Sequence, residues 1–435
     1  MPNIRAPALE RFRRLSKEGA WIVFGQATAV LGSLASVRLL TELLDPAAYG
    51  ELALGMTVAA VVNQTLIGPL GNGVARFYAP AQERGDLGGY LNTVRRLVAA
   101  ATVIIILMIL LTAAGLLIAG QMQWIGIATA ALVFATLTGY NGILSGIQNA
   151  ARQRSIVALH QGMESWVRFL VAAGLLLWLG ATSTVAMAGY AVAVALILGS
   201  QYVFFRKTVP RNATAADKAG GWQEQIWKYS WPFGAWGIFS WAQQASDRWA
   251  LELFATTQEV GLYAALFQLG YYPMSMATGM SMQFLGPIFY QWAGDASDSR
   301  RNENVSKLSR RLTGLTLALT GAVFLIALLF HAQIFRILVA REYASVSYLL
   351  PWMLLAGGVF AAGQTIALDL MSQMKTRTMA VAKIATSSLG IIFNFAGAYF
   401  LGIKGIVVAI VLFSVLYSVW LAAISIRTAA ESGIQ

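Results

Sequence analysis

The stretches ASVRLLTELL (residues 35–44) and ASDRWALELF (residues 245–254) repeat Ala, Ser, Arg, Glu and Leu at the same offsets. Each copy carries an arginine, Arg38 or Arg248, inside or at the end of a strongly apolar segment. A charged side chain in the middle of a membrane helix costs roughly 2.5–3.5 kcal/mol on insertion, so such a residue usually has a specific role. The repeat therefore indicates a duplicated chain in which both copies keep an arginine in apolar surroundings.

Apolar segments make up most of the chain. Of its 435 residues, 57% are hydrophobic and only 11% are charged, whereas about a quarter of the residues in soluble domains are charged. Runs of about 20 apolar residues are long enough to cross a bilayer as helices. We expect an all-α integral membrane protein with twelve spans, near residues 20–40, 49–73, 97–119, 124–146, 156–178, 183–205, 230–254, 260–290, 312–331, 346–371, 379–401 and 404–426.

The basic residues predict the topology. If the N-terminus is cytoplasmic, most of the 31 lysines and arginines fall in the two tails and in every second loop, all on the cytoplasmic side. The opposite side receives only Arg336, Arg341 and Lys404. Cytoplasmic loops of membrane proteins carry this excess of positive charge. We therefore expect a multi-pass protein with both termini in the cytoplasm, and we interpret the net charge of +12 as a topology signal rather than a nucleic-acid surface.

The loops after the second and eighth spans extend the repeat. Phe77-Tyr78 corresponds to Phe289-Tyr290, and both loops end in Arg-Arg-Leu. The chain is therefore expected to form two pseudo-symmetric six-helix lobes around a central cavity. The lobes are residues 1–205 and 230–435, joined by a cytoplasmic linker at 206–229. Since six is even, both lobes enter the membrane from the same side, an arrangement typical of transporters.

Several classes of function lack their motifs. The sequence has no GxxxxGK[ST] phosphate-binding loop, no cysteine, no HExxH and only two histidines. We therefore expect no cofactor and no metal. No catalytic set stands out, and the longest loop on the side opposite the termini, residues 332–345, is short for a glycan polymerase or ligase. The sequence thus favours a protein that is not an enzyme.

Polar side chains within the spans predict a water-filled cavity. Arginine suits bidentate contacts with phosphate, so the basic members of this set favour an anionic cargo. His160, Glu164 and Arg168 recur at helical spacing and share one helix face. The candidate cargo-binding residues are Arg38, Arg168, Arg248, Asn63, Gln64, Gln244, Lys383 and Asn394.

Structural roles for the same residues stay open. Arg38 could pair with Glu42 at the membrane interface, and Lys383 could lie at the cytoplasmic edge. Asp247 and Arg248 point about 100° apart on a helix, so they could pair across helices as a lock between elements. The His160, Glu164 and Arg168 set could be an internal salt bridge.

Four stretches lead to a family. They are LLDPAAYGELAL (43–54), GPLGNGVARFYA (68–79), ASDRWALELFATTQEVGLYAAL (245–266) and NFAGAYFLGIKGIVVAI (394–410). In this order the chain resembles the polysaccharide transporter (Wzx-type oligosaccharide, or O-antigen, flippase) family of the multidrug/oligosaccharidyl-lipid/polysaccharide exporter superfamily. The resemblance covers essentially the whole chain.

The resemblance implies a flippase of the bacterial cytoplasmic (inner) membrane that acts in cell-surface polysaccharide biosynthesis. It would move an undecaprenyl-diphosphate-linked oligosaccharide from the cytoplasmic to the periplasmic leaflet by alternating access, with Arg38, Arg168 and Arg248 serving the diphosphate. A coupling cation, H⁺ or Na⁺, is implied, with Asp247, Glu164, His160 and Asp369 as ion-coupling or gating candidates. Membrane lipid and a polysaccharide polymerase are the implied partners, and a monomer is expected.

Two rival interpretations remain. An ion-coupled multidrug exporter of the same superfamily predicts a cavity dominated by acidic residues, whereas more of the candidate cavity residues are basic. A scaffold without transport activity is disfavoured by the duplicated six-span halves and the charges within spans.

Overall fold

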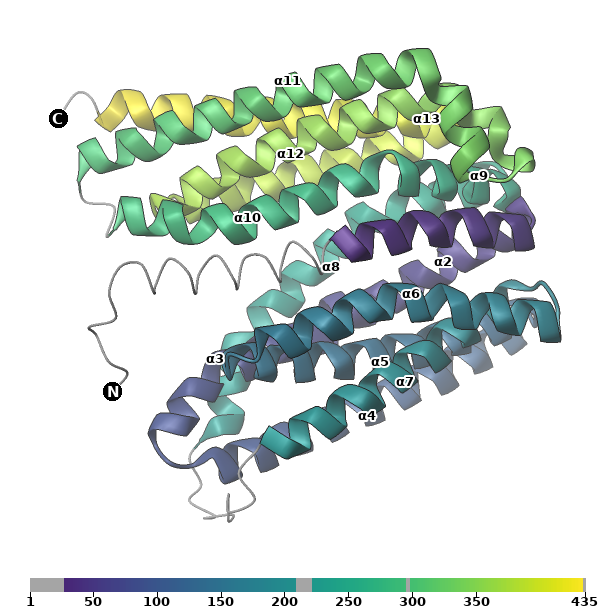
Figure 1. Ribbon diagram of the computed structural model, residues 1–435, viewed down its shortest axis with the longest axis horizontal. Coiled ribbons are helices and arrows are strands. Elements are labelled where there is room, and N and C mark those ends of the chain that lie inside the picture. Colours follow the sequence, from purple (N-terminus) through teal and green to yellow (C-terminus); the bar gives the residue numbers. More distant parts are fainter. Residues whose placement is uncertain (1–26, 209–220, 295–297, 433–435) are drawn as a thin grey trace. The chain divides into compact units, whose positions relative to one another are not determined.

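The computed structural model describes residues 27–208, 221–294 and 298–432, and the elements in these ranges are helical (Figure 1). In chain order they are a helical segment at 27–43, α2 (Pro46–Val62), the π-helix η1 (Asn63–Ile67), α3 (Gly68–Glu83), α4 (Leu87–Ile118), α5 (Gln123–Ala150), α6 (Arg154–Leu179), α7 (Ser183–Thr208), α8 (Trp222–Phe254), α9 (Thr257–Leu269), α10 (Tyr271–Ala293), α11 (Ser299–Leu338), the 3₁₀ helix η2 (Arg341–Leu349), α12 (Leu350–Ser372) and α13 (Thr376–Ser432).

Eight helical segments in the described residues are long and apolar enough to cross a membrane, so the predicted all-α membrane fold is confirmed. The last of them, Val381–Arg427, contains two of the predicted spans. These two spans meet at Gly402, whose φ of 56° lies in the left-handed region that glycine tolerates. The predicted span at 260–290 is instead two helices, α9 and α10. The break lies just before Pro273, which has no N–H to bond the carbonyl of Leu269.

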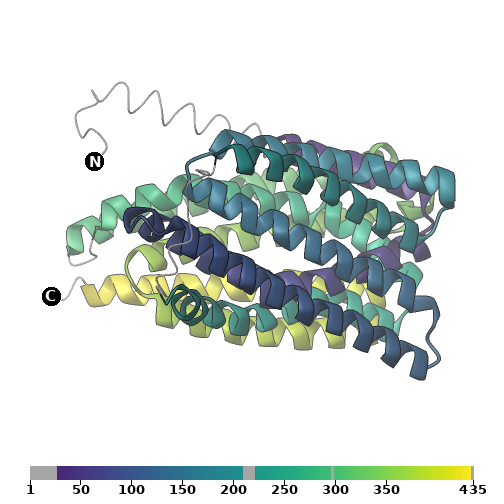
Figure 2. The same ribbon diagram turned by 90° about the horizontal axis from the view of Figure 1, so that it is seen from below.

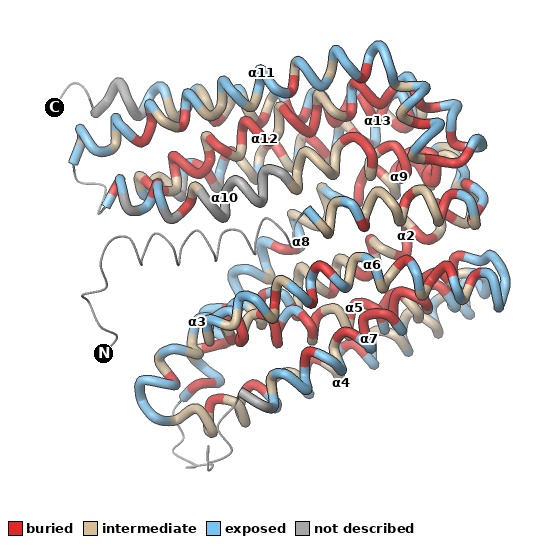
Figure 3. The backbone as a smooth tube through the Cα atoms, in the orientation of Figure 1, coloured by how far each residue is buried: buried red, intermediate tan, exposed pale blue. Residues whose placement is uncertain are grey.

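Burial separates inner helices from lipid-facing ones (Figure 3). In the Arg341–Ser372 segment, 72% of the most apolar window is buried, whereas only 11% is buried in Leu87–Ile118 and in Arg300–Leu338. The last two helices are strongly apolar and yet exposed along most of their length. Exposing so large an apolar surface to water is unfavourable. We therefore place the exposed faces of these two helices in the hydrocarbon of a bilayer.

The described chain packs as two compact units. Unit 1 contains residues up to Ser36 and Leu54–Trp241, and unit 2 contains Val37–Ala53 and Ala242 onward. The boundaries therefore fall inside the first helical segment, α2 and α8, rather than at residues 206–229, where the sequence places the linker between lobes. In unit 1, α5 packs against α3, α4 and α7, and α6 packs against α7. In unit 2, α12 packs against α10, α11 and α13. Both views show that the long helices within each unit run roughly alongside one another (Figures 1 and 2).

Hydrogen bonds explain why residues 37–53 belong to unit 2. The Thr41 hydroxyl accepts a bond from the backbone N–H of Ala340, 3.1 Å away. The hydroxyl of Tyr343, a buried residue, donates to the carbonyl of Leu44 at 2.9 Å. The end of the first helical segment is thus bonded to the start of η2.

The duplicated stretches lead into a close helix crossing in unit 2. Asp45 caps α2 by accepting the Ala48 N–H at 2.7 Å, and Thr256 caps α9 by accepting the Glu259 N–H at 3.2 Å. Beyond these caps, Gly50 and Gly261 face each other, and a Cβ built on either one would lie 2.9 Å from the backbone nitrogen of the other. Only glycine allows this approach.

We expect Gly261→Ala to destabilise the protein by about 1–3 kcal/mol, because its methyl group would overlap the Pro46 carbonyl and the backbone of α2. The matched control is Gly174→Ala in α6, where an added Cβ meets nothing within 4 Å. This control should raise stability by about 0.8–1 kcal/mol, since alanine is the better helix former. Thermal unfolding midpoints in detergent test the pair, and equal midpoints for both variants would contradict the crossing.

Candidate functional site

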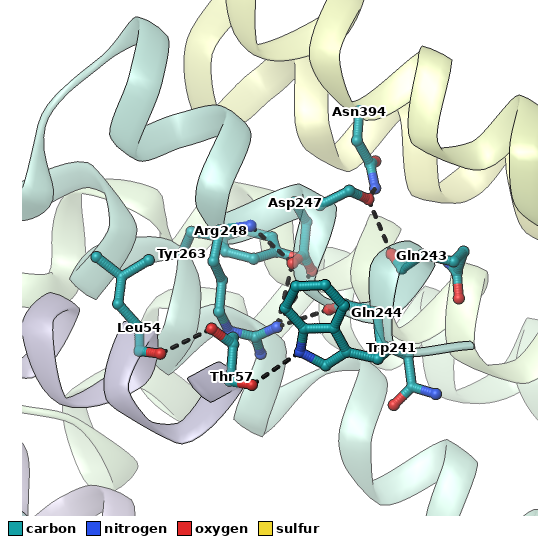
Figure 4. A network of polar contacts seen from close by, with 10 residues as sticks. Leu54, Thr57, Trp241, Gln243, Gln244, Asp247, Arg248, Tyr263 and Asn394 are labelled. Atoms are coloured by element: carbon teal, nitrogen blue, oxygen red, sulfur yellow. Dashed lines mark hydrogen bonds and ion pairs between the residues drawn. The ribbon is translucent and has the colours of Figure 1, made fainter. Parts of the chain in front are cut away.

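An ion pair near the end of α8 forms the centre of the polar network in unit 2 (Figure 4). Arg248 Nη1 lies 3.1 Å from Asp247 Oδ1, and the two side chains are 15% and 5% exposed. The other carboxylate oxygen accepts a hydrogen bond from the buried hydroxyl of Tyr263 in α9. Both oxygens of Asp247 are therefore engaged by groups within the same unit.

Aromatic rings and a backbone carbonyl hold the Arg248 guanidinium. Its Cζ lies 4.7 Å from the ring centroid of Phe267 and 5.8 Å from that of Tyr263, within the range of cation–π attraction. Its Nη1 also donates to the carbonyl of Gln244 at 3.2 Å. Asp247 and Arg248 also contact each other, because the carboxylate folds back onto the adjacent residue and accepts both its N–H and its side chain. Both residues contact α9 as well, as the hypothesis of a lock between helices expects.

Asn394 joins this network from α13. Its Nδ2 donates to the Ser246 hydroxyl at 2.8 Å, and that hydroxyl donates to the Gln243 carbonyl at 2.9 Å. Gln244 lies one residue further along α8 with an exposed side chain. Through Ser246, Asn394 thus lies beside the segment of α8 that carries Asp247 and Arg248.

Lys383 lies on α13 about three turns before Asn394. Its side chain is partly buried, and among the described residues no carboxylate lies within ion-pair distance. A lysine in an apolar helix without a counter-ion is a candidate contact for an anion.

Arg38 has a structural environment. It pairs with Glu42 one turn later, and its Nη1 donates to the carbonyl of Val339 at 2.5 Å. Val339 follows the last residue of α11, whose terminal carbonyls have no partner within the helix. Arg38 therefore caps the end of α11, so the two repeated arginines have different partners.

Unit 1 holds the second set of predicted residues. Glu164 of α6 accepts a hydrogen bond from Asn141 Nδ2 of α5 at 2.9 Å, and Arg168 one turn later interacts with it electrostatically. The Arg168 guanidinium carbon lies 5.2 Å from the ring centroid of Tyr190 in α7. The helix face predicted from the spacing of these residues thus points into the α5–α6–α7 bundle.

His160 is buried on the same face but engages other partners. Its Nδ1 lies 2.8 Å from the Ile156 carbonyl and its Nε2 3.2 Å from the Ser200 hydroxyl. A carbonyl can only accept, so Nδ1 donates to Ile156, and Nε2 forms the hydrogen bond to the serine. His160 is thus fully bonded in the helix bundle and is not part of a salt bridge with Glu164.

Asn63 and Gln64 begin the π-helix η1 that interrupts the path from α2 to α3. Asn63 Nδ2 donates to the Ala59 carbonyl at 3.3 Å. The backbone of Gln64 and Thr65 is approached by Gly237 and Gly234 of α8, where an added Cβ would meet their carbonyls. Single π-helical turns often occur at functional sites.

Asp369 is separate from both networks. It lies at the end of α12, is 1% exposed, and accepts hydrogen bonds from Ser306 of α11 at 3.1 Å and from Gln373 Nε2 at 2.6 Å. Ser425 of α13 is 3.4 Å from its second oxygen. Within the described ranges its hydrogen-bond donors are neutral and join the ends of three helices, and Arg310 of α11 interacts with it electrostatically.

The fold matches known membrane transporters. No model of a known protein family matches the sequence, and no curated protein does either. A solved structure of a multidrug resistance MATE family transporter of the MOP superfamily, in an inward-facing conformation, superposes with a TM-score of 0.73 at 12% identity, over 94% of this chain and 95% of that one.

Two further structures agree with it. The lipid II flippase MurJ, in an inward closed conformation, gives a TM-score of 0.70 at 13% identity, over 93% of this chain and 86% of that one. A single-residue mutant of the Vibrio cholerae MATE transporter VcmN gives 0.62 at 14% identity, over 97% of both chains. This chain has their fold.

Sequence reasoning missed one part of unit 1. Asn141, Ser145 and Gln148 are buried on α5, and they face buried Gln201 on α7, whose Nε2 donates to Ser145 Oγ at 2.9 Å and to Gln148 Oε1 at 2.6 Å. The signal was present in the spacing, because positions 141, 145 and 148 share one face of a helix. Their partner Gln201 lies on another helix, so the sequence alone does not show that this face is paired.

We expect Arg38→Gln to destabilise the protein by about 1.5–3 kcal/mol, because it removes a charge-assisted hydrogen bond from the end of α11. Lys228→Gln is the matched control. Lys228 forms the same i, i+4 ion pair with Glu224, but both side chains are about 70% exposed, and such surface pairs contribute roughly 0–1 kcal/mol. Chemical or thermal unfolding measures the stability of the two variants, and Arg38→Gln should be the less stable. A loss of cargo affinity without a loss of stability would instead favour the original cargo role of Arg38.

Asp247→Asn should destabilise unit 2 by about 3–5 kcal/mol, since it leaves the buried Arg248 charge unpaired. Tyr263→Phe removes only one hydrogen bond and should have a smaller effect, about 1–3 kcal/mol. The double variant Asp247→Asn/Arg248→Met should recover much of the loss. A double-mutant cycle by thermal unfolding measures the coupling, and additive losses would rule out the pair as a stabilising unit.

Proposed function

We propose that this chain is a flippase for an undecaprenyl-diphosphate-linked oligosaccharide. Its fold is shared with a lipid II flippase and with multidrug transporters. The observation that favours an anionic lipid-linked cargo is Lys383, a partly buried cation in an apolar helix with no carboxylate partner among the described residues. A diphosphate supplies the missing negative charge.

Of the other candidate cations, Arg38 is occupied by Glu42 and the end of α11, and Arg248 by Asp247. Arg168 retains the face of Tyr190 and the electrostatic contact with Glu164. We propose Lys383 as the primary diphosphate contact, with Arg168 and Arg248 as further contacts once their carboxylates are neutralised. Gln64, Gln244, Asn63 and Asn394 would contact the sugar through hydrogen bonds.

The remaining parts of the proposal follow the sequence. The basic loops favour cytoplasmic termini in the bacterial inner membrane. The protein would work as a monomer, by alternating access driven by H⁺ or Na⁺, and would pass its product to a polysaccharide polymerase. It would act as a transporter, not as an enzyme.

An ion-coupled multidrug exporter is the second candidate. Asp369 favours it, because this buried carboxylate accepts hydrogen bonds only from neutral donors in the described structure and could attract a cationic drug in competition with Arg310. Asp369 joins helix ends, however, and is only 1% exposed, so a large organic cation could not reach it without displacing α11 or α13.

Flipping of a lipid-diphosphate-oligosaccharide in proteoliposomes tests the proposal. Lys383→Gln should lower the rate by roughly tenfold or more, because a charge-assisted contact is lost, and Lys383→Arg should retain most of it. The control is Lys404→Gln, at an exposed position of the same helix.

Two outcomes would contradict this proposal. One is a Lys383→Gln variant that flips the lipid as fast as wild type. The other is a wild type that moves no such lipid under any ion gradient but expels a cationic dye, with Asp369→Asn abolishing expulsion. The second result would establish the exporter instead.

A further inference from the structure

The polar stripe on α5 is the least satisfied part of unit 1. Thr138, Asn141, Ser145 and Gln148 follow one face of this helix over about 15 Å. That face points toward α6 and α7, the helices that pack beside α5 in Figure 1. These residues lie in a segment that is apolar enough to cross a membrane.

Several atoms of the stripe are buried without a hydrogen-bond partner in the described structure. They are Thr138 Oγ1, Asn141 Oδ1, Gln148 Nε2, Gln201 Oε1 and Gln153 Oε1. Turning the amides does not remove the problem. The Gln148 and Gln201 amides bond each other through one atom each. The second polar atom of each amide therefore stays without a partner in either orientation of the amide.

The threonine makes the contrast clear. Thr136 in the same helix donates to the carbonyl of Leu132 at 2.8 Å, as Thr102 and Thr65 do to the carbonyls four residues before them. The Thr138 hydroxyl makes no such bond. It therefore remains available to a group outside the helix backbone.

Water fits this set of atoms better than a metal ion. Asn141 Oδ1 and Gln201 Oε1 are acceptors, whereas Gln148 Nε2 is a donor. A cation would satisfy the oxygens and would be repelled by the amide N–H groups. Buried water donates and accepts, and typically makes about three hydrogen bonds to such orphaned groups.

The stripe connects two places in the unit. One turn before its Thr138 end, Asn141 Nδ2 donates to Glu164, which lies one turn from Arg168. At the other end is Gln153, in the turn between α5 and α6, whose neighbours Arg152 and Arg154 predict a cytoplasmic location. A row of water along the stripe would link Glu164 to the cytoplasm.

We propose that Asn141, Ser145, Gln148 and Gln201 hold a hydrated track that carries protons between the α5–α6 turn and Glu164, with Thr138 one turn beyond its inner end. A proton passes from water to the Glu164 carboxylate, which becomes a neutral carboxyl group. The Arg168 guanidinium then loses its counter-charge and can bind an anion. Proton uptake and binding of an anionic cargo would therefore favour each other.

Few other titratable groups surround Glu164. Arg168 and His160 lie one turn away on α6, and Tyr190 faces Arg168 from α7. Helix α5 has no charged residue, and its Tyr140 hydroxyl is bonded to Thr102 of α4 instead. No charged residue occurs in segment 27–36. Glu164 is thus the one carboxylate that the track reaches.

The track can be tested without transport. Infrared spectra of the full-length protein in lipid nanodiscs, compared with Glu164→Gln, identify the protonated Glu164 carboxyl band. A switch from H₂O to D₂O then gives its exchange rate. We expect Gln148→Met/Gln201→Met and the single change Gln148→Met to slow this exchange at least tenfold, because each removes amide groups between the turn and Glu164. Thr136→Val, outside the track, is the control and should leave the exchange unchanged.

Two results would overturn the track. One is the absence of a Glu164-dependent carboxyl band at every pH. The other is exchange in the folded variants within twofold of wild type. Thermal unfolding checks folding, and Gln148→Met, which changes one side chain at nearly constant volume, keeps the test decisive where the double change does not fold.

The coupling of proton uptake to cargo binding rests on the proposed function. A second measurement tests the track and the flippase function separately. In proteoliposomes a pH gradient should accelerate flipping of a lipid-diphosphate-oligosaccharide by wild type. The Gln148→Met variant should lose that acceleration but still equilibrate the lipid without a gradient. A wild type with fast, track-dependent exchange that flips no lipid would refute the function and keep the track. Gradient-driven flipping with exchange unchanged in the variants would refute the track alone.

Discussion

A polar group inside a bilayer must find its partner within the protein, because the lipid offers none. The described structure is arranged around this constraint. Arg248 has Asp247, two aromatic rings and a backbone carbonyl, and Arg38 has Glu42 and the end of α11. The groups that remain incompletely paired are therefore the informative ones, since a helix that crosses a membrane keeps them at a cost in stability.

This reasoning separates residues that stabilise from residues that are available. Asp247 and Tyr263 close the network of α8 and α9, and Asn394 connects it to α13 through Ser246. Lys383 and the stripe on α5 differ from these, because parts of them have no partner among the described residues. Such groups can bond a ligand without first breaking a contact inside the protein.

The sequence predicted the helices because length and apolarity decide them. The span at 260–290 was wrong as one helix, since periodicity does not show whether a proline will break a helix or only bend it. The ionisable residues were found because they are rare in apolar segments. Their partners were not, because Arg38 meets Val339 only through tertiary packing. The boundaries between the two compact units also depend on tertiary packing. Two of them fall inside α2 and α8, helices in which glycines let backbones approach closely.

The repeated arginines show why duplication does not preserve function residue by residue. Both copies keep the N-terminal caps of the following helix and the glycine beyond them, so Asp45 and Gly50 correspond to Thr256 and Gly261. Those features fix the backbone, and the crossing tolerates no side chain at either glycine. The arginine positions are freer, because a long side chain can reach different partners from the same backbone site. Arg38 is used to cap a helix, and Arg248 is held beside a carboxylate. The repeat is therefore clearest in the helix caps and glycines that determine the backbone path. The two copies differ most in the partners of their charged residues.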